Sequence, residues 1–234
     1  MNTLYGEHQT PLHVASQLGQ HKTMLSLIHQ GANPNSENAT KETPLFMASR
    51  NGNAKITKLL LGLGNRVHVN HQDLEKRTPL HEASAKGYDS VAQLLLESNA
   101  NCNAKTIHQW TPLHLASLMG ESAVVKVLLD HGAEANVQDD SKWTPLHMAS
   151  QKGHVGVVKL LLANKNAKVD GKKADGETAL HLAAYYGHDE VVRSLISHGA
   201  DQQIQNKKNE TALDLARKKG HENIVQSFGA IGRS

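Results

Sequence analysis

Apolar residues recur along the chain in two alternating patterns, each of which ends at a glycine. One is "TPLHLASLMG" (111–120) and the other is "ESAVVKVLLDHG" (121–132), whose valines and leucines recur at helical spacing. The opening threonine is suited to cap a helix, and the proline after it suits the first helical position. Glycine suits the left-handed residue that follows a helix. Each such segment therefore predicts two short helices joined by a turn.

The pattern repeats along the whole chain. Its opening threonines are 33 to 35 residues apart, at Thr10, Thr43, Thr78, Thr111, Thr144, Thr178 and Thr211. Helices this short are marginal alone, so each unit must bury its apolar stripe against its neighbours. We expect one all-α solenoid domain over residues 1–234, with a turn or β-hairpin finger between units. The predicted units are 5–37, 38–72, 73–105, 106–138, 139–172, 173–205 and 206–234, the last a C-terminal cap with a polar outer face.

The period, the helix–turn–helix pattern and the T-P-L-H-x-A signature resemble the ankyrin repeat. The resemblance covers about residues 5–232 and is clear in stretches such as "DSKWTPLHMASQKG". It implies that the tetrapeptide histidine bonds to its threonine and to neighbouring backbone, which is a structural role. The chain departs from the pattern at Phe46, which replaces that histidine, and by extra residues in "GLGNRVHVN" and "ANKNAKV". We expect these insertions to tilt neighbouring fingers without breaking the stack.

Composition narrows the function further. The chain has 38% hydrophobic residues, enough for a core, and 25 basic against 22 acidic residues. That balance argues against nucleic acid or an anionic membrane as the main partner. Cys102 is the single cysteine, so an intrachain disulfide is excluded and a reducing compartment is favoured. With no secretory signal pattern and no apolar run of about 20 residues, we expect an intracellular protein, cytoplasmic or nuclear.

Candidate chemistry is sparse. Ten of the 16 histidines stand at repeat positions, and of the others His68 and His71 lie three residues apart in the widened finger. Two ligands fall short of the three that a zinc site needs. Cys102 has no histidine placed by a motif to activate it, and no phosphate-loop or nucleophile motif occurs. We therefore expect no catalytic activity, metal or cofactor, and keep a metal-dependent enzyme built on this finger as an alternative.

Basic residues cluster near the C-terminus, at Lys207, Lys208, Arg217, Lys218 and Lys219. A solvated capping face is the favoured interpretation, and contact with phosphate or nucleic acid is the alternative. The cluster lacks interleaved aromatic side chains, which argues against single-stranded binding.

The resemblance also implies where a partner would bind. In ankyrin proteins the partner usually lies in the concave face, against finger residues just before the threonine and helix residues just before the glycine. Aromatic, methionine and arginine side chains are enriched at interface centres. On this chain we predict one aromatic and aliphatic patch over the fourth to sixth units, flanked by basic residues; the contact residues are Arg77, Lys86, Trp110, Leu118, Met119, Trp143, Lys152, Tyr185 and Tyr186. The alternative is that the tryptophan rings pack on adjacent fingers.

These features together predict a non-catalytic protein-interaction module, monomeric alone, that binds a folded domain or an extended peptide as an adaptor, scaffold or inhibitor. The alternative is the targeting array of a larger protein such as a scaffold, a transcriptional regulator or a bacterial effector. We expect neither nucleic acid nor a membrane to be the partner.

Overall fold

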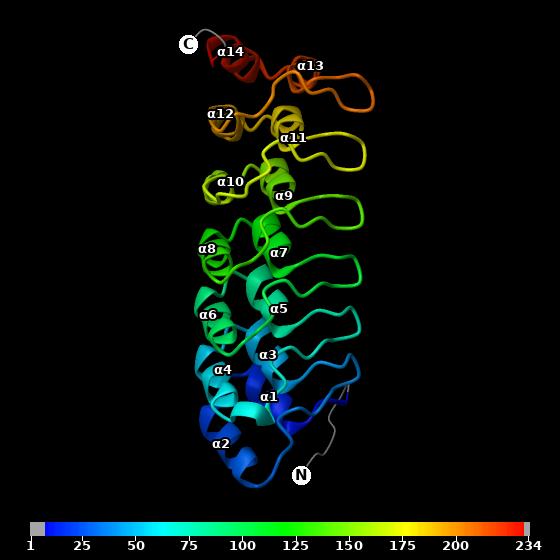
Figure 1. The fold of residues 1–234 in the computed structure, drawn as a ribbon. Helices are drawn as coiled ribbons and strands as arrows, with labels where there is room; N and C mark the ends of the chain where they lie inside the picture. The colour runs from blue at the N-terminus through cyan, green and yellow to red at the C-terminus, as the bar shows by residue number, and fades with distance from the viewer. Residues whose placement is uncertain (1–7, 232–234) are drawn as a thin grey trace. The chain divides into compact units, whose positions relative to one another are not determined.

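The computed structural model describes residues 8–231, which form short helices joined by turns, with no β-strand in that part of the chain (Figure 1). The first helices of successive pairs are α1 (Pro11–Gln17), α3 (Pro44–Arg50), α5 (Pro79–Ala85), α7 (Pro112–Met119), α9 (Pro145–Lys152), α11 (Ala179–Tyr186) and α13 (Ala212–Lys219). The second helices are α2 (His21–His29), α4 (Ala54–Leu61), α6 (Asp89–Glu97), α8 (Ser122–Asp130), α10 (Val155–Leu162), α12 (Asp189–Ser197) and α14 (Glu222–Ile231). The all-α prediction is confirmed, and the fingers are turns rather than β-hairpins.

Threonine caps the first helices, as the sequence predicts. In α9, the Thr144 hydroxyl and backbone N–H both donate to His147 Nδ1, at 2.7 and 3.1 Å. The His147 N–H in turn donates to Thr144 Oγ1 at 3.4 Å, which completes a reciprocal capping box. Because Nδ1 accepts, the proton of the neutral ring is on Nε2.

The Nε2 proton of the capping histidine ties the start of four first helices to the next finger. In the first unit, His13 donates to the Glu42 carbonyl at 2.9 Å and His81 to the Trp110 carbonyl at 3.1 Å. In the second unit, His114 and His181 donate to the carbonyls of Trp143 and Glu210, each at 3.1 Å. The structural role expected for these histidines is therefore confirmed.

His147 is the exception. Its Nε2 is buried without a hydrogen-bond partner among the described residues. The finger that follows carries the one-residue insertion, and Lys173 stands there where other fingers have Asn, Asp or Thr. In the fourth finger along the chain, Asp139 Oδ1 accepts the Trp143 N–H at 2.8 Å, a turn-closing bond that a lysine cannot make. The finger with the insertion keeps the same main-chain bonds, but its Glu177 N–H donates instead to Asp175 Oδ1 at 3.2 Å.

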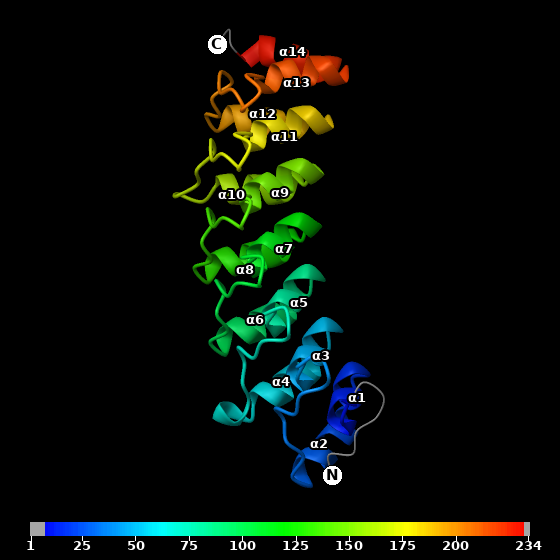
Figure 2. The ribbon, with the colours of Figure 1, turned by 90° about the vertical axis from the view of Figure 1, so that its right-hand side faces the viewer.

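The helices group into two compact units, one extending to Pro112 and including 130–133, the other comprising 113–129 and the described residues from 134 onward. In the first unit, α1, α3 and α5 pack side by side, and α2, α4 and α6 form a second layer. In the second unit, α9, α11 and α13 form one layer and α10, α12 and α14 the other (Figure 2). The predicted repeat boundaries stay predictions.

The core of each unit is built from the same sequence positions. The leucine two residues after the capping threonine is almost fully buried in every pair except the last, for example Leu12 and Leu80 in the first unit and Leu180 in the second. Second helices contribute residues such as Leu95 and Val157. Burying such a side chain stabilises the fold by about 1.5–3 kcal/mol, which short helices cannot obtain alone.

The fingers share one backbone geometry. The residue two before the capping threonine has a positive φ in every finger, whether it is Lys41, Lys76, Gln109, Lys142, Gly176 or Asn209. Main-chain bonds join consecutive fingers: Leu74 N–H donates to the Thr40 carbonyl at 3.2 Å, and Ala174 N–H to the Ser141 carbonyl at 3.0 Å. The two extra residues after α4 are taken up by a 3-10 turn, η2 (Gly64–Arg66).

Candidate functional site

Six of the predicted contact residues lie in the second unit, and we call them the second-unit surface: Leu118, Met119, Trp143, Lys152, Tyr185 and Tyr186. All except Trp143 stand in the last turn of a first helix. Contacts join these helix ends, since Gln151 Nε2 donates to the Tyr186 hydroxyl at 3.2 Å and His154 Nε2 donates to the Leu118 carbonyl at 3.0 Å. The ends of α7, α9 and α11 therefore belong to one continuous row.

This row exposes large apolar side chains. Met119 is 54% exposed and Tyr186 is 47% exposed, whereas Tyr185 is half-buried. The Tyr185 and Tyr186 rings meet edge to face with centroids 5.0 Å apart, and the Tyr186 ring stacks on His188 at 6.4 Å. These contacts orient Tyr186 while leaving about half of it accessible, which suits an interface residue.

Trp143 is less accessible than its position implies. Lys173 from the next finger places Nζ 5.1 Å from the centroid of the indole ring, and His147 meets the ring edge at 6.2 Å. Lys173 is itself held by Glu177 at 2.9 Å and by Asp175. Burial lowers the pKa of Lys173, but these carboxylates outweigh it and raise the pKa above its ordinary value. Part of the tryptophan therefore packs on the adjacent finger, as the alternative interpretation expected.

In the first unit, Arg77 is fully engaged within the chain. Its guanidinium pairs with Asp73 at 2.8 Å, with Glu82 at 3.0 Å and with Glu75 at 3.4 Å. Lys86 is exposed directly after the end of α5, the helix that contains Glu82, and Trp110 is half-buried. Among these three predicted contact residues, only Lys86 presents an exposed side chain.

Phe46 explains why Arg77 is held so firmly. It occupies the position of the capping histidine, is fully buried, and has no group that could bond to the next finger. The Arg50 guanidinium lies 4.9 Å from the centroid of its ring and that of Arg77 lies 6.0 Å away. Arg50 also pairs with Glu42 and, at 3.0 Å, with Glu82. Ion pairs thus replace the histidine bond between the finger and the helix.

Glu42 and Arg50 of this network are held in their ionised forms. Burial raises the pKa of Glu42, but hydrogen bonds from Arg50 and Asn38 outweigh it, so the pKa lies below its ordinary value. Burial lowers the pKa of Arg50, and its bonds to Glu42 and Glu82 more than compensate. Sequence reasoning missed this network. Its signal was Glu82, an acid at a helix position that holds Leu115, Met148, Leu182 and Leu215 in the second unit.

Sequence reasoning also missed an apolar pair on the fingertips of the first unit. Leu74 is 58% exposed and Ile107 is 46% exposed. They lie on consecutive fingers that are joined by a bond from the Ile107 N–H to the Glu75 carbonyl, 3.0 Å long. Equivalent positions in the second unit hold Asp140, Ala174 and Lys207, so the pair distinguishes the first unit.

The other candidates have ordinary contacts. His71 donates from Nε2 to the Lys41 carbonyl at 2.9 Å, and Cys102 Sγ lies 3.5 Å from the His131 carbonyl. Within residues 8–231, no cluster of three or more His, Cys, Asp or Glu side chains has a metal-binding arrangement. None of the described helices combines the length and apolar character needed to cross a bilayer.

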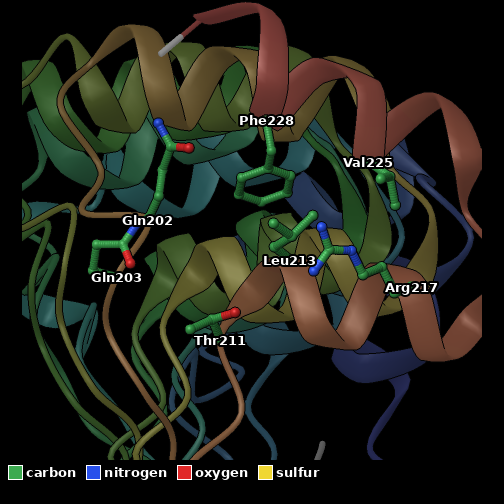
Figure 3. Close-up of a pocket in the computed structure, with 7 residues that line it drawn as sticks. All are labelled: Gln202, Gln203, Thr211, Leu213, Arg217, Val225 and Phe228. Atoms are coloured by element: carbon green, nitrogen blue, oxygen red, sulfur yellow. The ribbon is translucent and has the colours of Figure 1, made fainter.

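A small hollow lies between α13 and α14, with Phe228 and Leu213 pointing toward one another (Figure 3). Its other lining residues are Gln202, Gln203, Thr211, Arg217 and Val225. Leu213 corresponds to the leucine that the following helix pair covers in earlier pairs, and here it is only half-buried. The hollow is the uncovered end of the second unit's core, and Arg217 is its only charged lining group.

A family model described as ankyrin repeats (3 copies) matches residues 12–106, 106–173 and 166–229. The chain belongs to the ankyrin repeat family. The structure resembles the human ASB11 ankyrin repeat domain with a TM-score of 0.84 and 29% identity, covering 94% of this chain and 98% of that one. It also resembles the ankyrin repeat domain of Bcl-3, a member of the IkappaB family, with a TM-score of 0.79 and 27% identity, covering 93% and 98%.

The comparison with curated proteins finds no match. Ankyrin repeats are a general protein–protein interaction fold, and neither the family match nor these structures point to an enzyme family.

Proposed function

We propose that this ankyrin repeat chain is a non-catalytic protein-binding module whose partner contacts the second-unit surface. The observation that carries the proposal is the exposure of Met119 and Tyr186 in one continuous row of helix ends. Large accessible apolar side chains that gather at one place often mark a partner site. The module acts as an adaptor, scaffold or inhibitor, either alone or as the array of a larger protein.

The rigidity of the row supports this function. Tyr186 is already held between Tyr185, His188 and the Gln151 amide, so little side-chain freedom is lost when a partner binds. Lys152 is exposed beside it and supplies a polar rim. Rigid aromatic anchors surrounded by polar groups are typical of interface hot spots.

In the first unit, we propose that Lys86 and the exposed part of Trp110 add contacts, with Arg77 as a fixed neighbour. Because Arg77 already has three carboxylate partners, it orients nearby groups more than it pairs with a partner. The prediction that all nine residues form one patch stays a prediction.

The test is affinity capture from cell lysate followed by mapping on the purified complex. A Met119→Ala/Tyr186→Ala variant removes two side chains that are about half exposed, so it should stay folded with a thermal midpoint only slightly below that of the wild type. It should lose the captured protein, because an anchor of this kind contributes about 2 kcal/mol or more to binding. A Trp143→Ala variant tests the half-buried member separately.

The matched control is Leu25→Ala, which removes a partly exposed leucine from α2 in the first unit. It should retain the partner. Hydrogen exchange of the complex should show protection at the ends of α7, α9 and α11. Retention by the Met119/Tyr186 variant, or protection confined to the second helices, would place binding elsewhere and refute the proposal.

A further inference from the structure

We infer that the partner of the second-unit surface is an acidic peptide segment in which carboxylate and apolar side chains alternate about every 10 Å. This inference rests on the proposed function and adds the chemistry of the partner. It is drawn from four residues that end consecutive first helices: Met119, Lys152, Tyr186 and Lys219.

The four residues occupy one structural position and alternate between apolar and basic. Each is the last residue of its helix, in α7, α9, α11 and α13. The helix ends that carry these residues are in contact. Gln151 of α9 bonds to the Tyr186 hydroxyl of α11, and Lys219 Nζ of α13 lies 4.3 Å from the Tyr185 ring centroid. We call this row the alternating row.

The cations of the row have no carboxylate partner among the described residues. Lys152 and Lys219 form no ion pair there, whereas Lys218 pairs with Glu210 at 2.7 Å and Lys173 pairs with Glu177. The four first helices of the second unit contain one carboxylate, Asp214. Its Oδ2 accepts bonds from the Thr211 N–H and hydroxyl, so it is committed to capping α13.

A lysine at the last residue of a helix also offsets the partial negative charge of the helix end. That effect explains why a lysine without a carboxylate partner is stable there. It does not account for apolar Met119 and Tyr186 in the same position of the intervening helices, where they remain about half exposed. Alternation of accessible apolar and cationic groups is complementary to a partner with the same alternation and the opposite charge.

The spacing defines the segment. Packed helices lie about 8–10 Å apart, so neighbouring members of the row are separated by roughly that distance. Residues seven apart on a helix, or three apart in an extended chain, span about 10 Å. The apolar side chains of the peptide would then contact Met119 and Tyr186, and its carboxylates would pair with Lys152 and Lys219.

The first unit lacks this alternation of apolar and basic residues at the ends of its first helices. Its first helices α1, α3 and α5 end in Gln17, Arg50 and Ala85, and Arg50 is already neutralised by Glu42 and Glu82. The preference for an acidic partner is therefore assigned to the second unit.

The experiment selects binders from a phage-displayed library of random peptides of about 25 residues, long enough for four groups spaced seven apart on a helix, against the full chain. We expect enriched sequences to be rich in Asp and Glu, with apolar residues three or seven positions away from the acids. A synthetic peptide of the enriched sequence should bind a Lys152→Ala/Lys219→Ala variant about three- to tenfold more weakly, and the difference should shrink in high salt.

The matched control is Lys126→Ala/Lys159→Ala, which removes the same charge from the second helices α8 and α10 and should bind the peptide like the wild type. Enriched peptides without an acidic bias, no enrichment at all, or equal affinity for the Lys152/Lys219 variant would each overturn the inference. If the enriched peptides have no acidic bias but still fail to bind the Met119→Ala/Tyr186→Ala variant, the proposed function stands and only the acidic preference fails. If a labelled single-stranded RNA binds and is lost by the Lys152/Lys219 variant, the lysines serve nucleic acid and the inference is overturned.

Discussion

The imidazole of His188 lies against Gly153, with Nδ1 only 2.6 Å from the place that a Cβ of residue 153 would occupy. Gly153 also has φ of 75°, a left-handed conformation. The same contact joins His154 to Gly120 and His221 to Gly187. In each case Nε2 of the histidine donates to a backbone carbonyl at the end of the preceding first helix, as His188 does to Gln151 at 2.9 Å. The glycine is needed both for its backbone angle and for its missing side chain.

Gly153→Ala is therefore expected to lower the free energy of unfolding by roughly 2–4 kcal/mol, the sum of left-handed strain and overpacking. Urea denaturation measures it. The control is Gly199→Ala, which has φ of 82° but no atom within 4 Å of the added Cβ, and should show the strain alone. Equal losses at the two positions would show that the histidine contact contributes nothing.

Acid should destabilise the fold through its capping histidines. Burial lowers the pKa of His81 and of His147 to about 4, from an ordinary 6.5. The unfolded chain takes up these protons near pH 6.5 and the folded chain only near pH 4, so stability is full above pH 6.5 and falls as the pH drops through that window. At pH 5 each histidine should cost roughly 2 kcal/mol.

Urea midpoints at pH 7.5 and pH 5 measure this loss, and NMR titration of the imidazole protons assigns it. The pKa values of His13 and His181 are lowered for the same reason and add to the effect. An unchanged midpoint at pH 5 would contradict the prediction.

Ser150→Ala is expected to stabilise the protein. The Ser150 hydroxyl is buried without a hydrogen-bond partner among the described residues, and Ala184 stands at the same position of α11. Removing an unsatisfied buried hydroxyl should raise the free energy of unfolding by up to about 1 kcal/mol. Ser16→Ala is the control, because Ser16 Oγ donates to the Leu12 carbonyl at 2.7 Å and its loss should destabilise. Urea denaturation of both variants measures the two changes in the free energy of unfolding. Equal losses of stability would show that the Ser150 hydroxyl is hydrogen-bonded.

Glu82→Gln is expected to destabilise the first unit by about 1–3 kcal/mol, because it leaves two partly buried arginines without their shared carboxylate. The comparison is Glu190→Gln. Glu190 pairs with Lys159 at 2.9 Å, but both side chains are more than half exposed, so that loss should stay below about 1 kcal/mol. Thermal or urea unfolding of both variants tests the difference. A Glu82 variant as stable as the Glu190 variant would show that the network contributes little.

The fold was predictable because its signals are local. Threonine, proline and glycine fix where a helix such as α9 begins and ends, and those residues lie within ten positions of one another. The network around Phe46 was not predictable in the same way. It joins Arg50 to Glu82, two residues 32 positions apart, through side-chain rotamers that no repeat pattern specifies.

The candidate site likewise has features that local repeat signals predict and features that depend on distant side chains. The repeat pattern placed Tyr186 and Met119 at helix ends, and their exposure follows from that position. It also placed Trp143 correctly in its finger, but the ring is partly covered by Lys173 of the next finger, at a position where the other fingers have Asn, Asp or Thr. The exposed pair Leu74 and Ile107 was missed because finger tips carry no periodic hydrophobic signal.

The fingers owe their shape to the main chain. Lysine, glutamine, asparagine and glycine all occupy the same left-handed position, and bonds such as that from Leu74 N–H to the Thr40 carbonyl join one finger to the next without using a side chain. The side chains at tip positions such as Leu74 and Ile107 take no part in these main-chain bonds. Substitutions at those positions can therefore change what the chain recognises without removing the bonds that join the fingers.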